Sequence, residues 1–582
     1  MKFQKRFLTF ALLCVFLLLI LWGRLFFLQV VQGNEFKLVS EQNRTRLVSS
    51  PGVRGGIYDR NGVCLAKDQP TYSVKVVPDD LKEEAIPLLS QIISMPVEEI
   101  QAKLDENNLP SWESFTLRTG LGEDVAQKIE EQHLKLPGVV LQIEPRRNYP
   151  FGNLFAHIIG YVREISKEEL ASLGEGGYVG GDIIGKTGLE KSYEDYLRGQ
   201  KGKQVIEVNA LGQPIKVLHE LEPQPGNDLI LSIDLKLQEK ARQILVDNNM
   251  NGAVVCLDPR NGEILAMAST PDYDPNLFVK GISSKDYESL LKAQAFIPKA
   301  TQDRFPPGST FKVITTIAAL EERVIDPKTY KVFCPGYIDI GDRRFYCWQT
   351  SGHGEQDLIE AIANSCNVFF YTLALDVGPE RLAKWARIFN LDGYTGVDLA
   401  DEAKGLIPDP EWKEKTTGEP WYPGDTANMG IGQGDVLVTP LGLANVYAAI
   451  ANGGTLYVPH LVKEIRTYDG LPVKTISSVV KAQIPLSEET LSYLREGMVK
   501  ATDRGTTQKI KLEGISVAAK TGTAQITGEK QDIWIAAYAP VENPEIVVLL
   551  MDEYSKILYG SYLAPFAHEL LSVYFSEKSA TP

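Results

Sequence analysis

The chain has 582 residues, more than one hydrophobic core usually supports, so two or three domains are expected. Its net charge of -15 at pH 7 argues against a nucleic-acid partner, because binding to phosphates requires a basic surface. Six cysteines are too few for a disulfide-rich scaffold of this length.

The N-terminus has the pattern of a membrane anchor. Residues 1–6 form a basic tail, and residues 7–31 are largely apolar, with Arg24 as their only charge. A run of this length is close to the roughly 20 residues that cross a bilayer. The alternative is a cleaved signal peptide, but no A-x-A-like arrangement of small residues follows the run. We therefore expect one uncleaved anchor, with the basic tail in the cytoplasm and the remaining chain exported.

A domain boundary is expected at residues 222–228, where two prolines and a glycine disfavour both helix and central strand. Residues 34–222 form the first domain, residues 228–575 the second, and residues 576–582 a C-terminal tail. In the second domain, strands and helices mix without regular β-α-β alternation, which favours an α+β fold.

The first elements of the second domain can be predicted from periodicity. Residues 229–233 alternate like a strand, and residues 235–246 have the spacing of an amphipathic helix. Residues 253–257 and 263–268 are apolar runs separated by the turn sequence Pro259–Gly262, which predicts a β-hairpin.

Residues 180–187 match the phosphate-binding pattern G-x-x-x-x-G-K-[ST] letter for letter. No convincing buried strand leads into this segment, and an exported domain would meet little nucleotide. We therefore reject a nucleotide-binding role.

Ser-x-x-Lys, which can place a serine nucleophile one helical turn from a lysine, occurs three times. The matches are Ser289 with Lys292, Ser309 with Lys312, and Ser478 with Lys481. Only Ser309 follows a sharp break, at residues 305–308, and begins a long apolar run that predicts a buried helix. Ser289 and Ser478 are expected at surface helix or loop positions.

A helix N-terminus suits nucleophilic catalysis by Ser309. Backbone N–H groups there stabilise an oxyanion, and a lysine desolvated in a cleft loses its proton more readily. Lys312 lies one turn after Ser309 on the same helix face, so a neutral Lys312 can deprotonate the hydroxyl.

Two later motifs select Ser309 among the three candidates. Ser365-Cys366-Asn367 follows it, and Lys520-Thr521-Gly522-Thr523 follows later. The order S-x-x-K, S-x-N, K-T-G is the signature of penicillin-binding proteins and serine β-lactamases. A second Lys-Thr-Gly at residues 186–188 precedes Ser309 and is out of order.

Each member of the later motifs has an expected role. Ser365 and Asn367 relay a proton and hold a substrate amide. Lys520 attracts the substrate's C-terminal carboxylate and discourages protonation of Lys312. Gly522 lets a peptide approach the strand edge, a form of β-strand addition.

Longer stretches around these motifs resemble the class B penicillin-binding proteins. In the second domain they are residues 305–312, 430–434 and 520–524, and in the first domain residues 54–62, 147–150 and 188–190. The resemblance covers residues 34 to about 575. It implies a mixed α/β pedestal domain followed by a transpeptidase domain, in which helices flank an antiparallel sheet.

The resemblance also implies an activity. Such an enzyme cross-links peptidoglycan stem peptides through a serine acyl-enzyme at the bacterial inner membrane, needs no catalytic cofactor, and is acylated by β-lactams. The oxyanion would be held by backbone N–H groups of Ser309 and Thr523, and the substrate by Thr521, Gly522 and Thr523. A D,D-carboxypeptidase, a division-specific transpeptidase, a β-lactamase and a vestigial scaffold remain as alternatives.

Residues 343–348 and 352–354 resemble the rod-elongation branch of this family. The chain has no obvious glycosyltransferase domain, so the resemblance implies partnership with a membrane glycosyltransferase of the SEDS type and with other elongation proteins. Residues 532–534 depart from the aromatic or histidine-containing segment expected after the K-T-G strand, so the acceptor side is left open.

Four soft metal ligands lie close together in the sequence: Cys334, Cys347, His353 and Cys366. Three thiolates and an imidazole suit a tetrahedral structural zinc, and Cys366 lies inside the S-x-N motif. Their spacing is not a standard zinc-finger pattern. A Cys334–Cys347 disulfide, favoured by an oxidising compartment, and simple buried thiols remain as alternatives.

Overall fold

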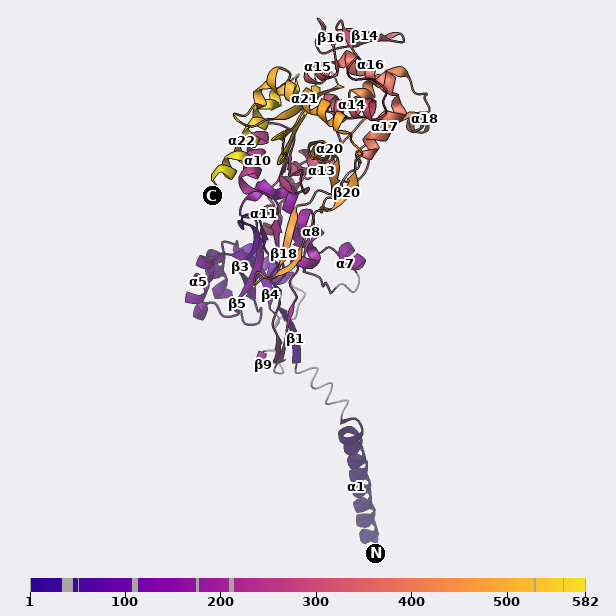
Figure 1. Cartoon of the computed structure of the whole chain (residues 1–582). Helices are drawn as coiled ribbons and strands as arrows, with labels where there is room; N and C mark the ends of the chain where they lie inside the picture. Colours follow the sequence, from indigo (N-terminus) through magenta and orange to yellow (C-terminus); the bar gives the residue numbers. More distant parts are fainter. Residues whose placement is uncertain are drawn as a thin grey trace. The chain divides into compact units, whose positions relative to one another are not determined.

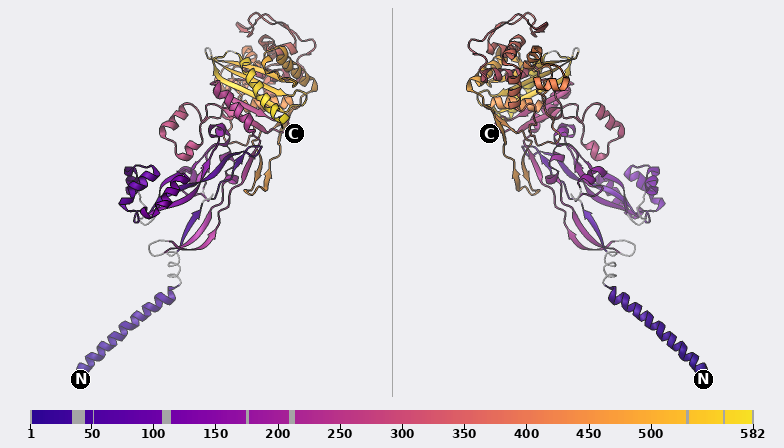
Figure 2. Two further views of the ribbon diagram at one scale, coloured as in Figure 1. Left: turned by 90° about the vertical axis from the view of Figure 1, so that its left-hand side faces the viewer. Right: turned by 90° about the vertical axis from the view of Figure 1, so that its right-hand side faces the viewer.

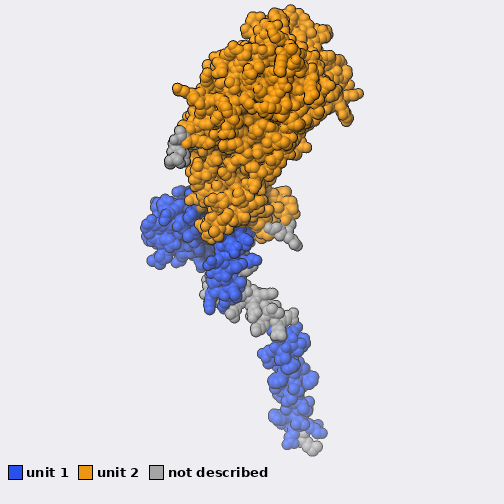
Figure 3. Space-filling model, in the orientation of Figure 1, with its two compact units in different colours: residues 1–53, 69–146, 199–225 blue, residues 54–68, 147–198, 226–582 orange. Residues whose placement is uncertain are grey.

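The computed structural model describes residues 2–33, 45–50, 52–106, 114–173, 177–208, 214–527, 530–557 and 559–580. Its contacts divide the chain into two compact units that alternate along the sequence (Figure 3). Unit 1 comprises residues 1–53, 69–146 and 199–225, and unit 2 comprises residues 54–68, 147–198 and 226–582.

The chain begins with a long apolar helix, α1 (Lys2–Phe26), which continues as a π-helical turn, Phe27–Val31 (Figure 1). The whole helix has 30 residues. Its most apolar stretch has a mean hydropathy of 2.6 and contains no buried residue. At 1.5 Å per residue it extends for about 45 Å, so by length and composition it is able to cross a bilayer.

Unit 1 has a small core of its own. Helices α3 (Ile86–Ile93), α4 (Val97–Asp105) and α5 (Glu123–Glu131) bury apolar side chains with strand β4 (Phe115–Leu121) and with the parts of β3 (Cys64–Val76) and β5 (Val139–Asn148) that belong to unit 1. A separate antiparallel sheet consists of β1 (Thr45–Ser50), β8 (Gly202–Val208) and β9 (Pro214–Leu221).

The centre of unit 2 is a five-stranded sheet in which every neighbouring pair is antiparallel. In spatial order its strands are β12 (Ile264–Ser269), β11 (Gly252–Leu257), β23 (Ile546–Ser555), β22 (Lys530–Ala539) and β21 (Ala518–Thr527). The predicted hairpin is thus β11 and β12. Every residue of both strands is buried, because helices cover both faces of the sheet.

Two long helices, α10 (Leu235–Asp247) and α22 (Ala564–Ala580), run beside each other on one face of this sheet (Figure 2). Asp234 caps α10, because its carboxylate accepts hydrogen bonds from the N–H groups of Lys236 and Leu237. A separate set of helices, including α13 (Lys299–Gln302) and α20 (Pro440–Ala451), packs against the sheet in the main hydrophobic core. This arrangement confirms the predicted α+β fold.

The remaining α-helices of residues 226–582 are α11 (Asn276–Lys280), α12 (Ser284–Lys292), α14 (Lys312–Glu321), α15 (Leu358–Ala363), α16 (Asn367–Val377), α17 (Pro379–Ile388), α18 (Pro410–Thr417), α19 (Pro423–Gly430) and α21 (Glu488–Arg504). Two-stranded antiparallel sheets pair β13 (Val332–Cys334) with β16 (Gly354–Gln356), β14 (Tyr337–Ile340) with β15 (Arg343–Tyr346), and β17 (Thr455–Tyr457) with β20 (Val480–Gln483).

Part of the first predicted domain belongs to unit 2. Strand β2 (Ile57–Tyr58) pairs in parallel with β10 (Asp228–Leu231), which pairs with β18 (Val462–Arg466), and β18 pairs with β19 (Pro472–Thr475). The same part contains α6 (Ala156–Ile159), β6 (Val162–Glu164), α7 (Lys167–Leu173), β7 (Ile183–Gly185), α8 (Gly188–Ser192) and α9 (Glu194–Leu197).

A buried ion network joins the three sequence stretches that resemble the pedestal. Glu190 is fully buried, and its two carboxylate oxygens accept hydrogen bonds from Arg54 Nε at 2.6 Å and Arg147 Nε at 2.7 Å. Arg147 also donates to the carbonyl oxygen of Gly55 at 2.8 Å. Residues distant in the sequence therefore neutralise one another in this network.

Candidate active site

The predicted nucleophile lies at the start of a helix. Residues Gly308–Phe311 form a 3₁₀ turn that leads directly into α14. Gly308 has φ +55°, and a β-carbon on it would lie 2.7 Å from the carbonyl oxygen of Thr523. The backbone around Ser309 therefore packs directly against the K-T-G strand, as close as a glycine permits.

The K-T-G strand makes the same contact from its own side. A β-carbon on Gly522 of β21 would lie 2.6 Å from the carbonyl oxygen of Pro307. Gly522 thus has a packing role in addition to the predicted one, because it brings β21 against the nucleophile turn. The two backbone N–H groups expected to bind the oxyanion, those of Ser309 and Thr523, belong to these two contacting segments.

Lys312, Ser365, Asn367 and Lys520 form one hydrogen-bonded cluster. The Lys312 amine donates to Ser365 O at 2.8 Å and to Asn367 Oδ1 at 2.7 Å, and lies 3.3 Å from Ser365 Oγ. The Lys520 amine donates to Ser365 Oγ at 2.7 Å. Three distant motifs therefore meet at the Ser365 hydroxyl, as their order in the sequence predicts.

Burial changes the acidity of both amines. Desolvation lowers the pKa of Lys312 to about 8. Desolvation, and then repulsion from Lys312, lowers the pKa of Lys520 well below its ordinary value. Since both amines contact one hydroxyl, the state in which only one of the two amines is protonated is favoured over the state in which both carry a positive charge.

Ser309 is only partly buried, which suits a residue that substrate must reach. Among the described residues, none forms a hydrogen bond with the Ser309 hydroxyl. The Lys312 amine instead donates to Ser365 and Asn367, so proton transfer from Ser309 requires the Ser309 or Lys312 side chain to move.

Sequence reasoning missed several side chains that hold the nucleophile turn. Trp534 on β22 is fully buried, and its indole Nε1 donates to Pro306 O at 3.0 Å. The Tyr447 hydroxyl donates to Thr310 O at 3.0 Å. Trp534 lies directly opposite Gly522 in the sheet register, a pairing that no pattern in the sequence indicates.

The segment 430–434, noted only for its resemblance, also supports this turn. The N–H of Gly308 donates to Gly432 O at 2.8 Å, and Thr315 Oγ1 donates to Gly430 O at 2.7 Å. A β-carbon on Gly432 would lie 2.4 Å from Gly308 O. These glycines therefore allow the segment to pack tightly against the start of α14.

The other two Ser-x-x-Lys matches lie on the surface, as predicted. Ser289 and Lys292 are exposed on α12, and Ser478 is exposed in the segment before β20. The rejected phosphate-binding pattern also lacks the required geometry. Strand β7 occupies its centre, where a phosphate-binding loop would lie, and Lys186 pairs with Glu169.

The four predicted metal ligands converge, with their ligand atoms all within 4.8 Å of one another. His353 Nδ1 lies 3.7 Å from Cys334 Sγ and 3.5 Å from Cys347 Sγ. Tetrahedral zinc with bonds of 2.0–2.3 Å places its ligand atoms about 3.5–3.8 Å apart, and both of these distances agree with that spacing.

One thiol of this cluster is suited to bind a metal. The hydrogen bond between Cys347 and Cys366 lowers the pKa of Cys347 and raises that of Cys366, and the thiolate is the form that binds metal. Cys334 and Cys347 are free thiols in the structure, so the alternative disulfide is not formed.

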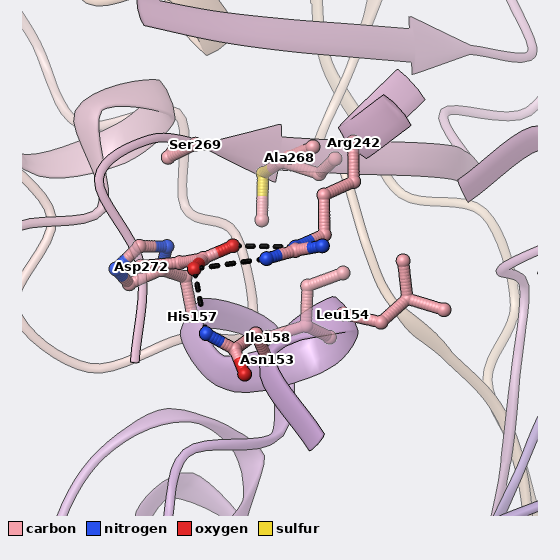
Figure 4. A pocket seen from close by; sticks show the side chains of 9 residues that line it. Asn153, Leu154, His157, Ile158, Arg242, Ala268, Ser269 and Asp272 are labelled. Atoms are coloured by element: carbon pink, nitrogen blue, oxygen red, sulfur yellow. Dashed lines mark hydrogen bonds and ion pairs between the residues drawn. The ribbon is translucent and has the colours of Figure 1, made fainter. Parts of the chain in front are cut away.

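A small cavity elsewhere in unit 2 is lined by polar groups, including Asn153, His157, Arg242 and Asp272 (Figure 4). Arg242 Nε donates to Asp272 Oδ2 at 2.5 Å, and Asn153 Nδ2 donates to Asp272 Oδ1 at 2.8 Å. Its volume of about 10 Å³ suits one water molecule, and none of the three motifs lines it.

Comparison with known proteins agrees with this geometry. A model of the penicillin-binding protein transpeptidase domain matches residues 252–572, and one of the penicillin-binding protein dimerisation domain matches residues 49–231. The chain is 35% identical to the peptidoglycan D,D-transpeptidase MrdA of Acinetobacter baumannii, over 98% of this chain and 87% of that protein.

Two solved structures are also similar. A complex between the penicillin-binding protein PBP2 and MreC from Helicobacter pylori matches with a TM-score of 0.79 and 29% identity, over 91% of this chain and 99% of that chain. A peptidoglycan synthase complex that coordinates polymerization and crosslinking matches with a TM-score of 0.74 and 31% identity, over 98% of both chains. The chain therefore belongs to the class B penicillin-binding proteins, the family of the peptidoglycan D,D-transpeptidase MrdA.

Proposed function

We propose that this enzyme cross-links peptidoglycan stem peptides during cell elongation, with Ser309 as its nucleophile. The observation that carries the assignment is the cluster in which the amines of Lys312 and Lys520 both reach Ser365 Oγ. One hydroxyl between two buried amines can pass a proton in either direction, as acyl transfer requires.

In the first half-reaction, Ser309 Oγ attacks the carbonyl carbon of the penultimate D-alanine, and Lys312 accepts the hydroxyl proton. Backbone N–H groups of Ser309 and Thr523 stabilise the oxyanion. The C–N bond then breaks, and the terminal D-alanine leaves as an amine after receiving a proton through Ser365. The product is an ester between the peptide and Ser309.

In the second half-reaction, an amine of a neighbouring stem peptide attacks this ester. A new amide bond forms as Lys312 accepts the proton that the amine loses, and this proton then passes to Ser309 as its C–O bond breaks. Asn367 holds a substrate amide, Lys520 and Thr521 attract the terminal carboxylate, and the backbone at Gly522 pairs with the extended peptide.

The test is product analysis with the full-length protein, a polymerising glycosyltransferase of the SEDS type and lipid-linked disaccharide–pentapeptide. We expect cross-linked dimers from the wild type and from Ser289→Ala, the exposed serine of a rejected match, and none from Ser309→Ala. Dimers from Ser309→Ala would refute the nucleophile assignment. Tetrapeptide monomers as the main product would indicate a carboxypeptidase.

Helix α1 is proposed as a single membrane anchor, with Lys2 and Lys5 cytoplasmic and the catalytic domain outside the inner membrane. The basic residues before the apolar run support this orientation. A cysteine-reactive, membrane-impermeant reagent should label an engineered Ser478→Cys on the exposed loop in intact spheroplasts. Labelling only after lysis would contradict the orientation.

The partners are proposed to be a SEDS-type glycosyltransferase and other elongation proteins, because similar chains were solved in a PBP2–MreC complex and a peptidoglycan synthase complex. Depletion of the enzyme from a rod-shaped cell should then cause rounding. Filamentation would instead indicate a role in division.

We also propose a structural zinc held by Cys334, Cys347, His353 and Cys366. Its ligand atoms all lie within 4.8 Å of one another, and Cys366 adjoins Ser365 and Asn367, so the metal would brace one wall of the active site. Purified protein should contain about one zinc per chain, and Cys334→Ser should contain much less. Less than half an equivalent in the wild type would refute the site.

A further inference from the structure

Ser365 has a backbone conformation that serine rarely adopts. Helix α15 ends in a Schellman motif, in which the N–H of Cys366 donates to Ala361 O at 3.0 Å and that of Ser365 to Ile362 O at 3.2 Å. This motif places Ser365 at φ +52°, where glycine is usual. The left-handed conformation costs about 1–2 kcal/mol for a residue with a side chain, so surrounding contacts must hold it.

Trp348 supplies such a contact from outside the three motifs. Its indole Nε1 lies 3.0 Å from Asn364 O and 3.2 Å from Ser365 O, and donates to both. These are the two carbonyl groups at the end of α15, which have no partner within the helix. The indole therefore caps the turn that carries Ser365.

The capped carbonyl is also part of the catalytic cluster. Ser365 O accepts a hydrogen bond from the Lys312 amine at 2.8 Å, while Ser365 Oγ faces the Lys520 amine. A rotation of the turn would move this carbonyl and the hydroxyl together. The indole N–H of Trp348 donates to these two carbonyl groups and to neither amine, so Trp348 acts through Ser365.

We infer that Trp348 is a positioning residue, whose indole N–H holds Ser365 in its left-handed conformation and thereby keeps the Ser365 hydroxyl between Lys312 and Lys520. This inference rests on the proposed proton relay through Ser365. It extends the active site to a side chain that lies beside the metal-ligand cluster. Loss of the Trp348 indole N–H affects the chemical step more than the binding of substrate.

The test measures acylation of full-length protein by a fluorescent penicillin, separating the acylation rate constant from the dissociation constant of the initial complex. Trp348→Phe keeps a ring but loses the N–H. A sharper variant carries 3-benzothienylalanine at position 348, which replaces only the N–H with sulfur. Loss of one hydrogen bond should reduce the acylation rate constant about three- to tenfold in both, with the dissociation constant within about twofold.

The matched control is Trp421→Phe, which removes an indole hydrogen bond of 2.8 Å to Thr426 Oγ1. It should acylate at the wild-type rate. The inference is overturned if the benzothienylalanine variant acylates normally, if Trp421→Phe loses as much, or if the loss is accompanied by release of zinc or a lower melting temperature.

Ser365→Ala distinguishes this inference from the proposed function. If Ser365→Ala acylates slowly and the benzothienylalanine variant is normal, only the role of Trp348 fails. If Ser365→Ala acylates at the wild-type rate, the proposed relay fails, and the role of Trp348 fails with it.

Discussion

Lys312 and Lys520 are 1% and 0% exposed, and both amines reach the hydroxyl of one serine, Ser365. Within the described part of the chain, neither amine forms an ion pair with a carboxylate. Water cannot screen their repulsion well at this depth, so the pair readily loses a proton. The free amine that nucleophilic catalysis requires is thus a consequence of burial.

This burial predicts the pH dependence of acylation. Because desolvation lowers the pKa of Lys312 to about 8, its neutral form becomes tenfold scarcer with each pH unit below that value. The rate constant for acylation by penicillin should therefore rise from pH 6 to about pH 8 and then level off. In Lys312→Arg, which stays charged, it should fall by about 10²–10⁴-fold. A profile that is flat between pH 6 and pH 9 would contradict the role of Lys312.

The buried pedestal network should contribute strongly to stability. Glu190→Gln removes the carboxylate that the two buried guanidinium groups share, so that Arg54 keeps only Glu194 and Arg147 only Asp68 at 3.5 Å. Removal of one partner of a buried pair typically costs about 3–5 kcal/mol. The melting temperature should fall by several degrees. The control Glu411→Gln breaks an exposed ion pair with Lys415 and should change it little. Equal melting temperatures for both variants would contradict this account.

At the scale of elements, the active site depends on the packing of strand β21 against the turn that precedes α14. Gly522→Ala tests this packing, because the new β-carbon would lie 2.6 Å from Pro307 O. Separating the two segments should reduce acylation by about 10- to 100-fold, in line with overpacking energies of 1–3 kcal/mol. Gly180→Ala, at a glycine with open space around it, should leave acylation unchanged. Normal acylation by Gly522→Ala would show that the contact is not needed.

Strand β22 contains a bulge at Asp532, whose carboxylate accepts a hydrogen bond from the N–H of Tyr554 at 3.0 Å. Burial raises the pKa of Asp532 from 3.8 to about 7. The folded state therefore keeps a proton that the unfolded state releases, and stability falls as pH rises from about 4 to 7.

Asp532→Asn removes this titration and keeps an oxygen that can accept from Tyr554. The melting temperature of the variant minus that of the wild type should increase by a few degrees when the pH is raised from 4.5 to 8. Thermal unfolding at both pH values measures the difference. A difference that does not depend on pH would mean that Asp532 is ionised in the folded protein.

At the scale of the whole molecule, the features predicted from sequence are those with a local signal. The apolar N-terminal helix, the β11–β12 hairpin and the helix start after Gly308 each depend on neighbouring residues. The convergence of Ser309, Ser365 and Lys520 is not local, and it was predicted because the order of their motifs is characteristic of one family.

Other features could not be predicted, because they depend on contacts between distant segments. The Glu190 network joins residues from three stretches, and nothing in any one stretch indicates its partners. The left-handed Ser365 occupies a position where sequence statistics favour glycine. Likewise, the hydrogen bonds of Trp348 and Trp534 to the two active-site turns require the tertiary structure.

The most direct test of the central claim is identification of the residue that penicillin acylates in the full-length protein. Peptide mass spectrometry after brief labelling should place the adduct on Ser309, and Ser309→Ala should remain unlabelled. An adduct on another residue, or equal labelling of Ser309→Ala, would contradict the convergence of the three motifs as the site of catalysis.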